Sequence, residues 1–188
     1  PTADPRLFTW SQRFGACPAC GGTGTAPIKP DDGDPPPCPA CGGMRLRPEA
    51  LSFRLRGRNI GEVSHLPIQD LRTWVEGLTL REEVGRQILP ELSGRLASLD
   101  RLGVGYLALD RAMNTLSTGE IQRIRICAEL ASSLRGACYI LDEPTVGLHP
   151  RDVRSLMESL TELRDRGNTV VVVEHQEPVI RAADHVVD

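Results

Sequence analysis

Four short segments set the architecture of this 188-residue chain: LSTGE at residues 116–120, CYILDE at 138–143, TVGLH at 145–149 and VVVVEH at 170–175. Apolar and β-branched residues fill positions 138–141 and 169–173, a pattern that is typical of buried β-strands. Between them, residues 151–165 have the pattern of a helix. A strand, a helix and a second strand in this order predict a βαβ unit, and hence a parallel sheet in an α/β fold.

Polar side chains follow each of the two predicted strands. Asp142 and Glu143 come directly after the first strand, and His175 follows the second. Ligands of open parallel sheets bind at the carboxyl ends of the strands. At that edge Asp142 can hold Mg²⁺ beside a triphosphate, while Glu143 orients or deprotonates an attacking water. We expect His175 to hydrogen-bond a γ-phosphate oxygen, so that Glu143 and His175 are the candidate catalytic residues.

In their order along the chain, these segments resemble the second half of an ABC-type ATPase cassette. Residues 117–120 are similar to the signature motif, although Thr118 replaces the usual glycine. The pair Asp142-Glu143 is similar to Walker B, residues 145–149 to the D-loop and His175 to the switch histidine. The resemblance implies ATP and Mg²⁺ as cofactors.

In such cassettes, the signature motif contacts ATP that a second cassette holds. The resemblance therefore assigns Ser117, Gly119 and Glu120 to ATP binding, with a second cassette or a homodimer as the partner. The Walker B pair and the switch histidine serve the ATP of their own cassette. From the residues alone, Ser117 and Glu120 can also form a capping box that opens a helix.

Several details are similar to one branch of these ATPases, the UvrA family of bacterial excinuclease systems. Glu120 stands where most cassettes have glutamine, and IQRIR follows it at residues 121–125. LDEP at 141–144 and RAADH at 181–185 also resemble this family. The resemblance implies a cytoplasmic, ATP-dependent protein that recognises DNA damage in nucleotide excision repair. Its implied partners are double-stranded DNA and a UvrB-like repair protein.

Two CPAC segments, at 17–20 and 38–41, have the spacing of a four-cysteine zinc site. Each pair can present two thiolates to one tetrahedral ion. We expect a structural Zn²⁺ that supplies on the order of 10 kcal/mol of folding free energy to a region rich in proline and glycine. The expected ligands are Cys17, Cys20, Cys38 and Cys41. The alternatives are reduced thiols without a metal, or a redox pair.

The cysteine segments also have a glycine pattern. Residues 17–24 fit the C-x-x-C-x-G-x-G repeat of the DnaJ zinc domain, but Arg45 replaces the last glycine of the second repeat. Zinc modules of the UvrA family share this cysteine and glycine style. Rad50-like proteins fit less well, because their hook uses one C-x-x-C per chain.

Arginine carries almost all of the positive charge of the chain. Lys29 is the only lysine, and the formal net charge of -3 gives no general signature of nucleic-acid binding. Arginine makes planar, bidentate contacts with phosphates and carboxylates. No run of eighteen apolar residues and no secretory leader occur, so we expect a soluble chain in the cytoplasm without a membrane partner.

Residues 52–58 alternate apolar side chains with arginines. The alternation predicts a strand with Phe53 and Leu55 on one face and Arg54, Arg56 and Arg58 on the other. The arginine face either contacts DNA phosphates or protects a solvated edge from pairing with another strand.

Helices are predicted on both sides of the signature. Residues 68–77 form one, and residues 80–102 form a second, which Pro90 kinks or divides. Its packing stripe is Ile88, Leu92, Leu96 and Leu99. The signature helix runs over 118–134, with Ile121, Ile124, Ala128 and Ala131 packed on the sheet. Arg123, Arg125 and Arg135 lie on or near its exposed side.

The chain thus divides into three predicted parts: a zinc module with the basic strand at 1–60, a helical signature region at 61–115 and a cassette part at 116–188. A complete ATP site also needs a G-x-x-x-x-G-K-[ST] loop, and no Gly-Lys dipeptide occurs. We expect that loop upstream of Pro1, and we expect the chain alone to be inactive as an ATPase. The alternatives are a zinc-stabilised module that binds nucleic acid or protein without catalysis, and a UvrA-like paralogue that serves drug resistance.

Overall fold

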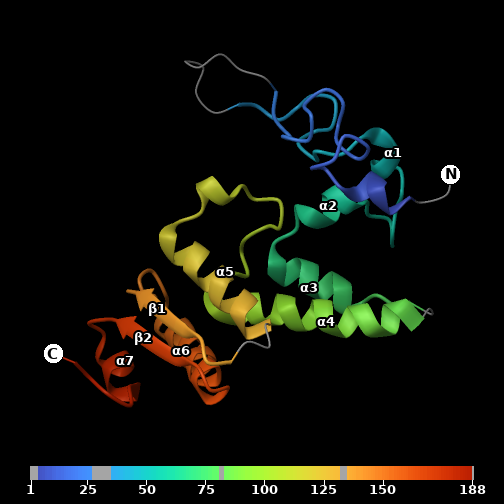
Figure 1. Ribbon diagram of the computed structural model, residues 1–188. Helices are drawn as coiled ribbons and strands as arrows, with labels where there is room; N and C mark the ends of the chain where they lie inside the picture. Colours follow the sequence, from blue (N-terminus) through green and yellow to red (C-terminus); the bar gives the residue numbers. More distant parts are fainter. Residues whose placement is uncertain (1–3, 27–34, 81–82, 132–134, 188) are drawn as a thin grey trace. The chain divides into compact units, whose positions relative to one another are not determined.

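The computed structural model describes residues 4–26, 35–80, 83–131 and 135–187. The chain forms two units, Pro1–His65 and Leu66–Asp188 (Figure 1). The finer division at 1–60, 61–115 and 116–188 stays a prediction. Among the described residues, no helix has the length and apolar character that crossing a membrane requires.

The second unit contains the predicted parallel sheet. Strand β1 (Cys138–Asp142) pairs in parallel with β2 (Thr169–Val173), and helix α6 (Pro150–Asp165) connects them. The register places Asp142 beside Val173, and the Glu143 N–H donates to the Val173 carbonyl at 2.9 Å. The βαβ prediction is confirmed, and the two strands end at the same edge.

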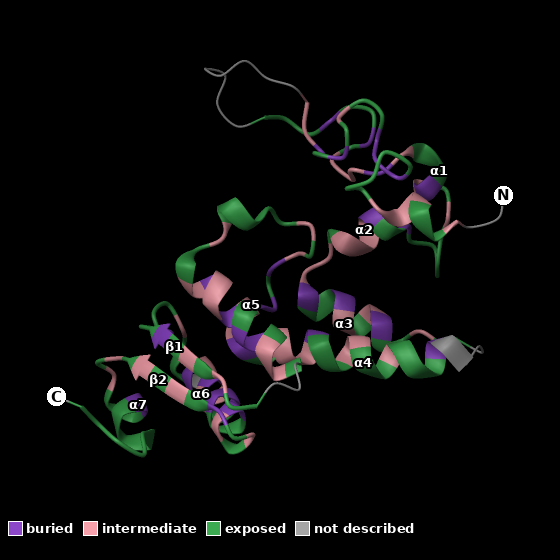
Figure 2. Ribbon diagram, viewed as in Figure 1, coloured by how far each residue is buried: buried purple, intermediate pink, exposed green. Residues whose placement is uncertain are grey.

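One face of this sheet is covered by helices, whereas the other is open. The core packs the covered face against α6 and against α5 (Thr118–Ala131), around Leu102, Ile126, Leu141, Leu156 and Leu163. On the open face Ile140 is 74% exposed and Val171 is 45% exposed. In Figure 2, α6 has both buried and exposed residues, as expected for a helix with one side against the sheet.

The two helices predicted at 68–77 and 80–102 are present, although residues 81–82 lie outside the described residues. They are α3 (Ile68–Glu76) and α4 (Glu83–Leu99), and α4 continues through Pro90. The predicted stripe on α4 is only partly right, because Leu96 is buried but Ile88 is 52% exposed. An apolar stripe on a helix is buried only where another element packs against it. The periodicity of the sequence does not indicate how far along the helix that packing extends.

A π-helical turn, η2 (Asp100–Val104), ends this helical region and contains Gly103. Gly103 has a φ of +74°, which glycine adopts without strain. A Cβ at this position would lie 3.1 Å from Cδ2 of Leu148 and 3.5 Å from Cβ of Asp152. Gly103 therefore permits the close approach of η2 to the segment that enters α6.

The signature helix α5 begins at Thr118 as predicted, but it buries a different side. Its buried residues are Glu120, Arg123, Ile126 and Cys127, whereas Ala128 and Ala131 are exposed. The expectation that Arg123 lies near the exposed side is wrong, since this residue is only 4% exposed. Local hydrogen bonds satisfy the buried Glu120, whereas Arg123 is buried at a position that the hydrophobic pattern assigned to solvent. Residues 132–134 of the predicted helix lie outside the described residues.

The helix η3 (Met113–Thr115) precedes the signature, and α7 (Glu177–Ala182) follows β2. In the first unit, the helices are short: η1 (Pro5–Phe8), α1 (Pro48–Leu51) and α2 (Ile60–Ser64). The described residues of this unit form isolated bridges and no regular strand.

The predicted basic strand at 52–58 is wrong. Leu55 and Arg58 exchange both backbone hydrogen bonds, at 2.8 and 3.1 Å, across a two-residue turn. Arg56 and Gly57 both have positive φ, +50° and +81°, as the tightest hairpin turns require. The turn reverses the chain after one residue pair, so no strand edge exists here and the edge-protection interpretation no longer applies.

We expect Leu96→Ala to lower the free energy of unfolding by about 3 kcal/mol, because it removes a fully buried side chain from α4. Ile88→Ala on the same helix is the matched control and is expected to cost less than about 1 kcal/mol. Urea denaturation measures both values. Equal losses would contradict the assignment of the buried face.

Candidate functional sites

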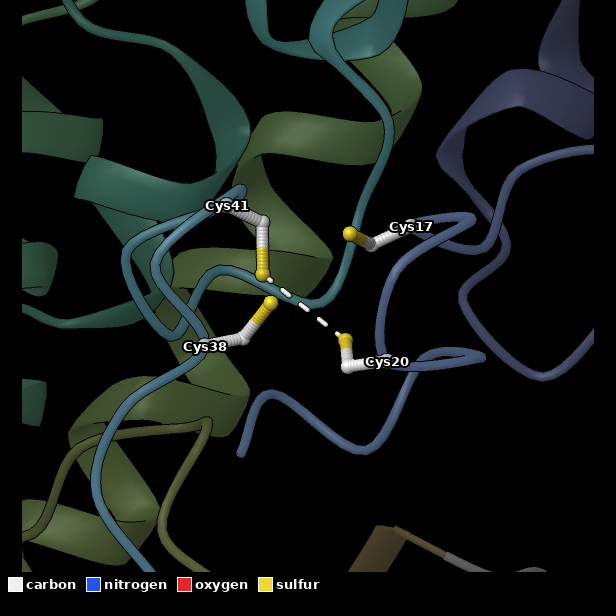
Figure 3. A group of neighbouring side chains, drawn as sticks. All are labelled: Cys17, Cys20, Cys38 and Cys41. Carbon is white, nitrogen blue, oxygen red and sulfur yellow. Dashed lines mark hydrogen bonds between the residues drawn. The ribbon is translucent and has the colours of Figure 1, made fainter. Parts of the chain in front are cut away.

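The four expected metal ligands form one cluster in the first unit. The cysteine cluster consists of Cys17, Cys20, Cys38 and Cys41, whose sulfur atoms all lie within 4.8 Å of one another (Figure 3). The sulfur atoms of Cys20 and Cys41 are 3.9 Å apart. A tetrahedral Zn²⁺ with bonds of about 2.3 Å requires sulfur separations of about 3.8 Å. The cluster therefore fits a zinc ion in size and in donor type.

The cluster is built from two copies of one backbone structure. The Cys17 carbonyl accepts from the Gly21 N–H, and the Cys38 carbonyl accepts from the Gly42 N–H, each at 2.8 Å. The N–H of each first cysteine then donates to the other copy: that of Cys38 to the Gly24 carbonyl at 2.9 Å, and that of Cys17 to the Arg45 carbonyl at 2.8 Å. The two repeats thus exchange matching hydrogen bonds, and each places two sulfur atoms at a shared centre.

Arg45 keeps the conformation of the glycine that it replaces. Its φ is +64°, and that of Gly24 at the equivalent position is +81°. A left-handed backbone costs a residue with a side chain roughly 1–2 kcal/mol. The exchanged hydrogen bonds hold Arg45 in this conformation, so the missing glycine does not break the repeat.

The environment of the thiols is uneven. Burial raises the pKa of Cys41 to about 12. Burial also acts to raise the pKa of Cys20, but N–H groups of Gly24 and Gly22 and the neighbouring thiols outweigh it, and the pKa falls to about 6. A metal ion would have to displace protons from the buried thiols, because zinc binds thiolates.

The second candidate site lies at the end of the sheet in the second unit. Nδ1 of His175 lies 3.6 Å from Oε1 of Glu143, and both side chains are more than half exposed, at 70% and 54%. Asp142 is exposed beside them, and its carbonyl accepts from Nε2 of Gln122 on α5 at 3.1 Å. The paired strands thus bring Asp142, Glu143 and His175 to one solvent-accessible edge.

The signature segment is held by a network around Glu120. Its Oε2 accepts from the Ser117 N–H at 2.6 Å, and the Glu120 N–H donates to Oγ of Ser117 at 3.3 Å. The hydroxyl of Tyr106 donates to Oε1. These donors lower the pKa of Glu120 to about 2, chiefly through Tyr106 and Ser117. The expected capping box is therefore present, and ATP binding by Ser117, Gly119 and Glu120 stays a prediction.

Gly119 connects the signature to the segment after β1. A Cβ on Gly119 would lie 3.2 Å from Nη1 of Arg123 and 3.6 Å from the carbonyl oxygen of Val146. Nε and Nη1 of Arg123 are buried and have no hydrogen-bond partner in the described part of the chain. Gly119 therefore allows the N-terminus of α5 to pack closely against the buried guanidinium of Arg123.

Three residues of this site were missed in the sequence. No local pattern indicates that Gln122 binds the main chain at the end of β1, or that Tyr106 binds the carboxylate of Glu120. Glu174 is also missed, although its side chain is only 2% exposed. Only the pairing of the strands indicates that Glu174 faces the segment after β1, because the register sets residues 143 and 174 side by side.

Comparison with known proteins gives matches that cover nearly the whole chain. It is 50% identical over 177 residues to UvrABC system protein A of Thermus thermophilus, and 51% identical over 176 residues to that of Methanothermobacter thermautotrophicus. Each match covers 92% of this chain and 16% of the relative. The chain therefore spans about one sixth of the length of these relatives.

Comparison of the fold also finds a UvrA protein. The crystal structure of UvrA2 from Deinococcus radiodurans superposes with a TM-score of 0.76 at 37% identity, over 95% of this chain and 20% of that one. A family model described as "AAA domain, putative AbiEii toxin, Type IV TA system" matches residues 106–182. This range contains the signature helix and the βαβ unit.

We expect one zinc ion per chain, bound by the cysteine cluster. Cys38→Ser removes a buried ligand and should lose the metal and the fold of the first unit, whereas Cys138→Ser on the sheet should keep both. Elemental analysis after a chelator wash, together with circular dichroism, measures the two effects. Zinc-free protein that retains its structure would exclude the site.

Proposed function

Because this chain belongs to the UvrA family, we propose that it supplies the signature, Walker B and zinc-binding parts of an ATP-dependent protein that recognises DNA damage in nucleotide excision repair. The observation that carries the proposal is the close approach of Glu143 and His175 at the ends of two paired strands. A carboxylate and an imidazole at this edge match the requirements of phosphate hydrolysis.

Each residue at the edge has a distinct role in the proposal. Asp142 would hold Mg²⁺, whose charge offsets that of the β- and γ-phosphates when the ion is bound. Glu143 accepts the proton of the attacking water, because its exposed carboxylate can reach solvent. His175 donates a hydrogen bond to a γ-phosphate oxygen, and the nearby carboxylate of Glu143 orients the ring.

The signature acts toward a second ATP. The N-terminus of α5 would present the positive end of the helix dipole to a phosphate. Ser117 and Gly119 would contact ATP held by another cassette, in the same protein or in a homodimer. Glu120 supports this segment through Ser117, and we include it in the ATP site on that ground.

The first unit is proposed to serve DNA binding. Zinc bound by the cysteine cluster stabilises a region that has little apolar core. Arg56 and Arg58 lie exposed on the hairpin turn, whereas Nη1 of Arg54 binds the Gly57 carbonyl at 2.7 Å and Glu62 at 3.1 Å. This turn can contact DNA phosphates, and a UvrB-like protein is the further partner proposed for the whole protein.

The first test uses a full-length protein that carries this sequence. Glu143→Gln should still bind ATP but hydrolyse it at least ~10²-fold more slowly, because it removes the base that takes a proton from water. Hydrolysis assays and nucleotide-binding measurements separate the two steps.

Glu158→Gln changes an exposed glutamate of α6; it is the matched control and should hydrolyse ATP at the normal rate. Unchanged hydrolysis in the Glu143→Gln protein would reject the proposed site. It would favour the alternative of a zinc-stabilised binding module without catalysis.

The second test concerns DNA. Replacing Arg54, Arg56 and Arg58 by alanine should weaken DNA binding and reduce the salt slope by about one for each phosphate that is no longer neutralised. Replacing the same residues by lysine keeps the charge and should keep most of the slope. An alanine variant with normal affinity and slope would show that these arginines do not contact DNA.

A further inference from the structure

The carboxylate of Glu174 lies between the two chain segments that carry the candidate catalytic residues. It follows β2 directly, yet its side chain is only 2% exposed, while that of the next residue, His175, is 70% exposed. An isolated buried carboxylate is costly, so its surroundings must stabilise the charge. These surroundings are the segment that follows β1.

The two oxygens of Glu174 serve different segments. Oε1 accepts from the N–H of Thr145 at 3.0 Å and also from the Thr145 hydroxyl. Oε2 accepts from the N–H groups of His175 at 3.1 Å and Gln176 at 3.4 Å. The carboxylate is therefore a bridge from the chain after β1 to the chain after β2.

The bridge is made by hydrogen bonds and not by an ion pair with arginine. In the part of the chain that the structure describes, the basic group within 4.0 Å of Glu174 is Nδ1 of His175, at 3.9 Å. Burial acts to raise the pKa of Glu174, but hydrogen bonds from Thr145, His175 and Gln176 outweigh it and the pKa is lowered. The group is an anion at neutral pH, and four donors share its charge.

The candidate catalytic residues lie close to both ends of this bridge. Glu143 is two residues before Thr145, and His175 is adjacent to Glu174. Glu143 has a φ of +43°, a conformation that surrounding contacts must maintain for a residue with a side chain. Since the side chains of Glu143 and His175 are both exposed, packing alone does not fix their separation.

We propose that Glu174 is a positioning residue, whose buried carboxylate ties the segment after β1 to the segment after β2 and so sets the geometry of Glu143 and His175. The effect of Glu174 on ATP hydrolysis rests on the function proposed above, whereas the hydrogen-bonded bridge does not depend on that function. The bridge and the effect on hydrolysis are therefore tested by separate measurements.

Hydrogen exchange on the full-length protein tests the bridge. Glu174→Gln keeps the size of the side chain but directs an amide NH₂ at donors on one side. We expect amides in 143–149 and 174–177 to exchange at least ~10-fold faster, while those of α6 keep their protection. Unchanged exchange would overturn the proposal whatever the enzyme does.

Kinetics with Mg·ATP test the positioning role. Glu174→Gln should lower kcat about 10-fold and leave KM for ATP within about 2-fold, because the geometry of the reacting groups changes and not the affinity. If the Glu174→Gln protein exchanges faster but has a normal kcat, the bridge exists but does not position the catalytic residues. If hydrolysis by the parent protein does not depend on Glu143, the proposed function fails, and the exchange result still decides the bridge.

Two further variants make the test specific. Glu177→Gln changes an exposed glutamate whose salt bridge is with Arg181, and it should alter neither exchange nor kcat. Thr145→Val removes the hydroxyl donor, whereas Thr145→Ser retains one. Combining Thr145→Val with Glu174→Gln should lower kcat no further than Glu174→Gln alone, since both act through the same hydrogen bonds. If the two substitutions lower kcat independently, so that their fold-losses multiply in the double variant, Thr145 and Glu174 do not act through one bridge.

Discussion

The parallel pairing of β1 with β2 is the constraint on which the second unit depends. Its register, with Asp142 beside Val173, determines which residues of the two following segments become neighbours. A shift of one residue would turn every side chain of a strand to the other face. It would move Leu141 out of the core and separate Glu143 from His175. The register of β1 and β2 therefore determines both the packing of the covered face and the geometry of the candidate site.

The sequence correctly predicted those elements that depend on the periodicity or spacing of residues close together in the chain. The two strands, the connecting helix and the cysteine cluster follow from runs of apolar residues and from paired cysteines. The predictions failed where interactions distant in sequence or backbone conformation decide the outcome. Arg56 in a left-handed turn converts an alternating pattern into a hairpin, and the buried side of α5 includes Glu120, which Tyr106 binds from 14 residues away.

The two units reach stability by different physical means. The second has a continuous apolar core, in which Leu102 and Leu156 are fully buried. The described part of the first unit instead buries cysteines, together with small residues such as Ala50, and exposes Trp10 and Phe14 at 48% and 44%. A region of this kind depends on directional bonds. The exchanged backbone hydrogen bonds of the two CPAC repeats position the thiols, and a metal ion bound there would supply the free energy that apolar burial does not.

The hydrogen bonds around the signature explain why glutamate is suited to position 120. Both of its oxygens accept, one from the Ser117 N–H and the other from Tyr106. A glutamine has one acceptor oxygen, so its NH₂ group would face one of these donors. A carboxylate at the third position of a helix also interacts favourably with the positive end of the helix dipole. Glu120 thus fixes the start of α5 with local hydrogen bonds to Ser117 and Tyr106.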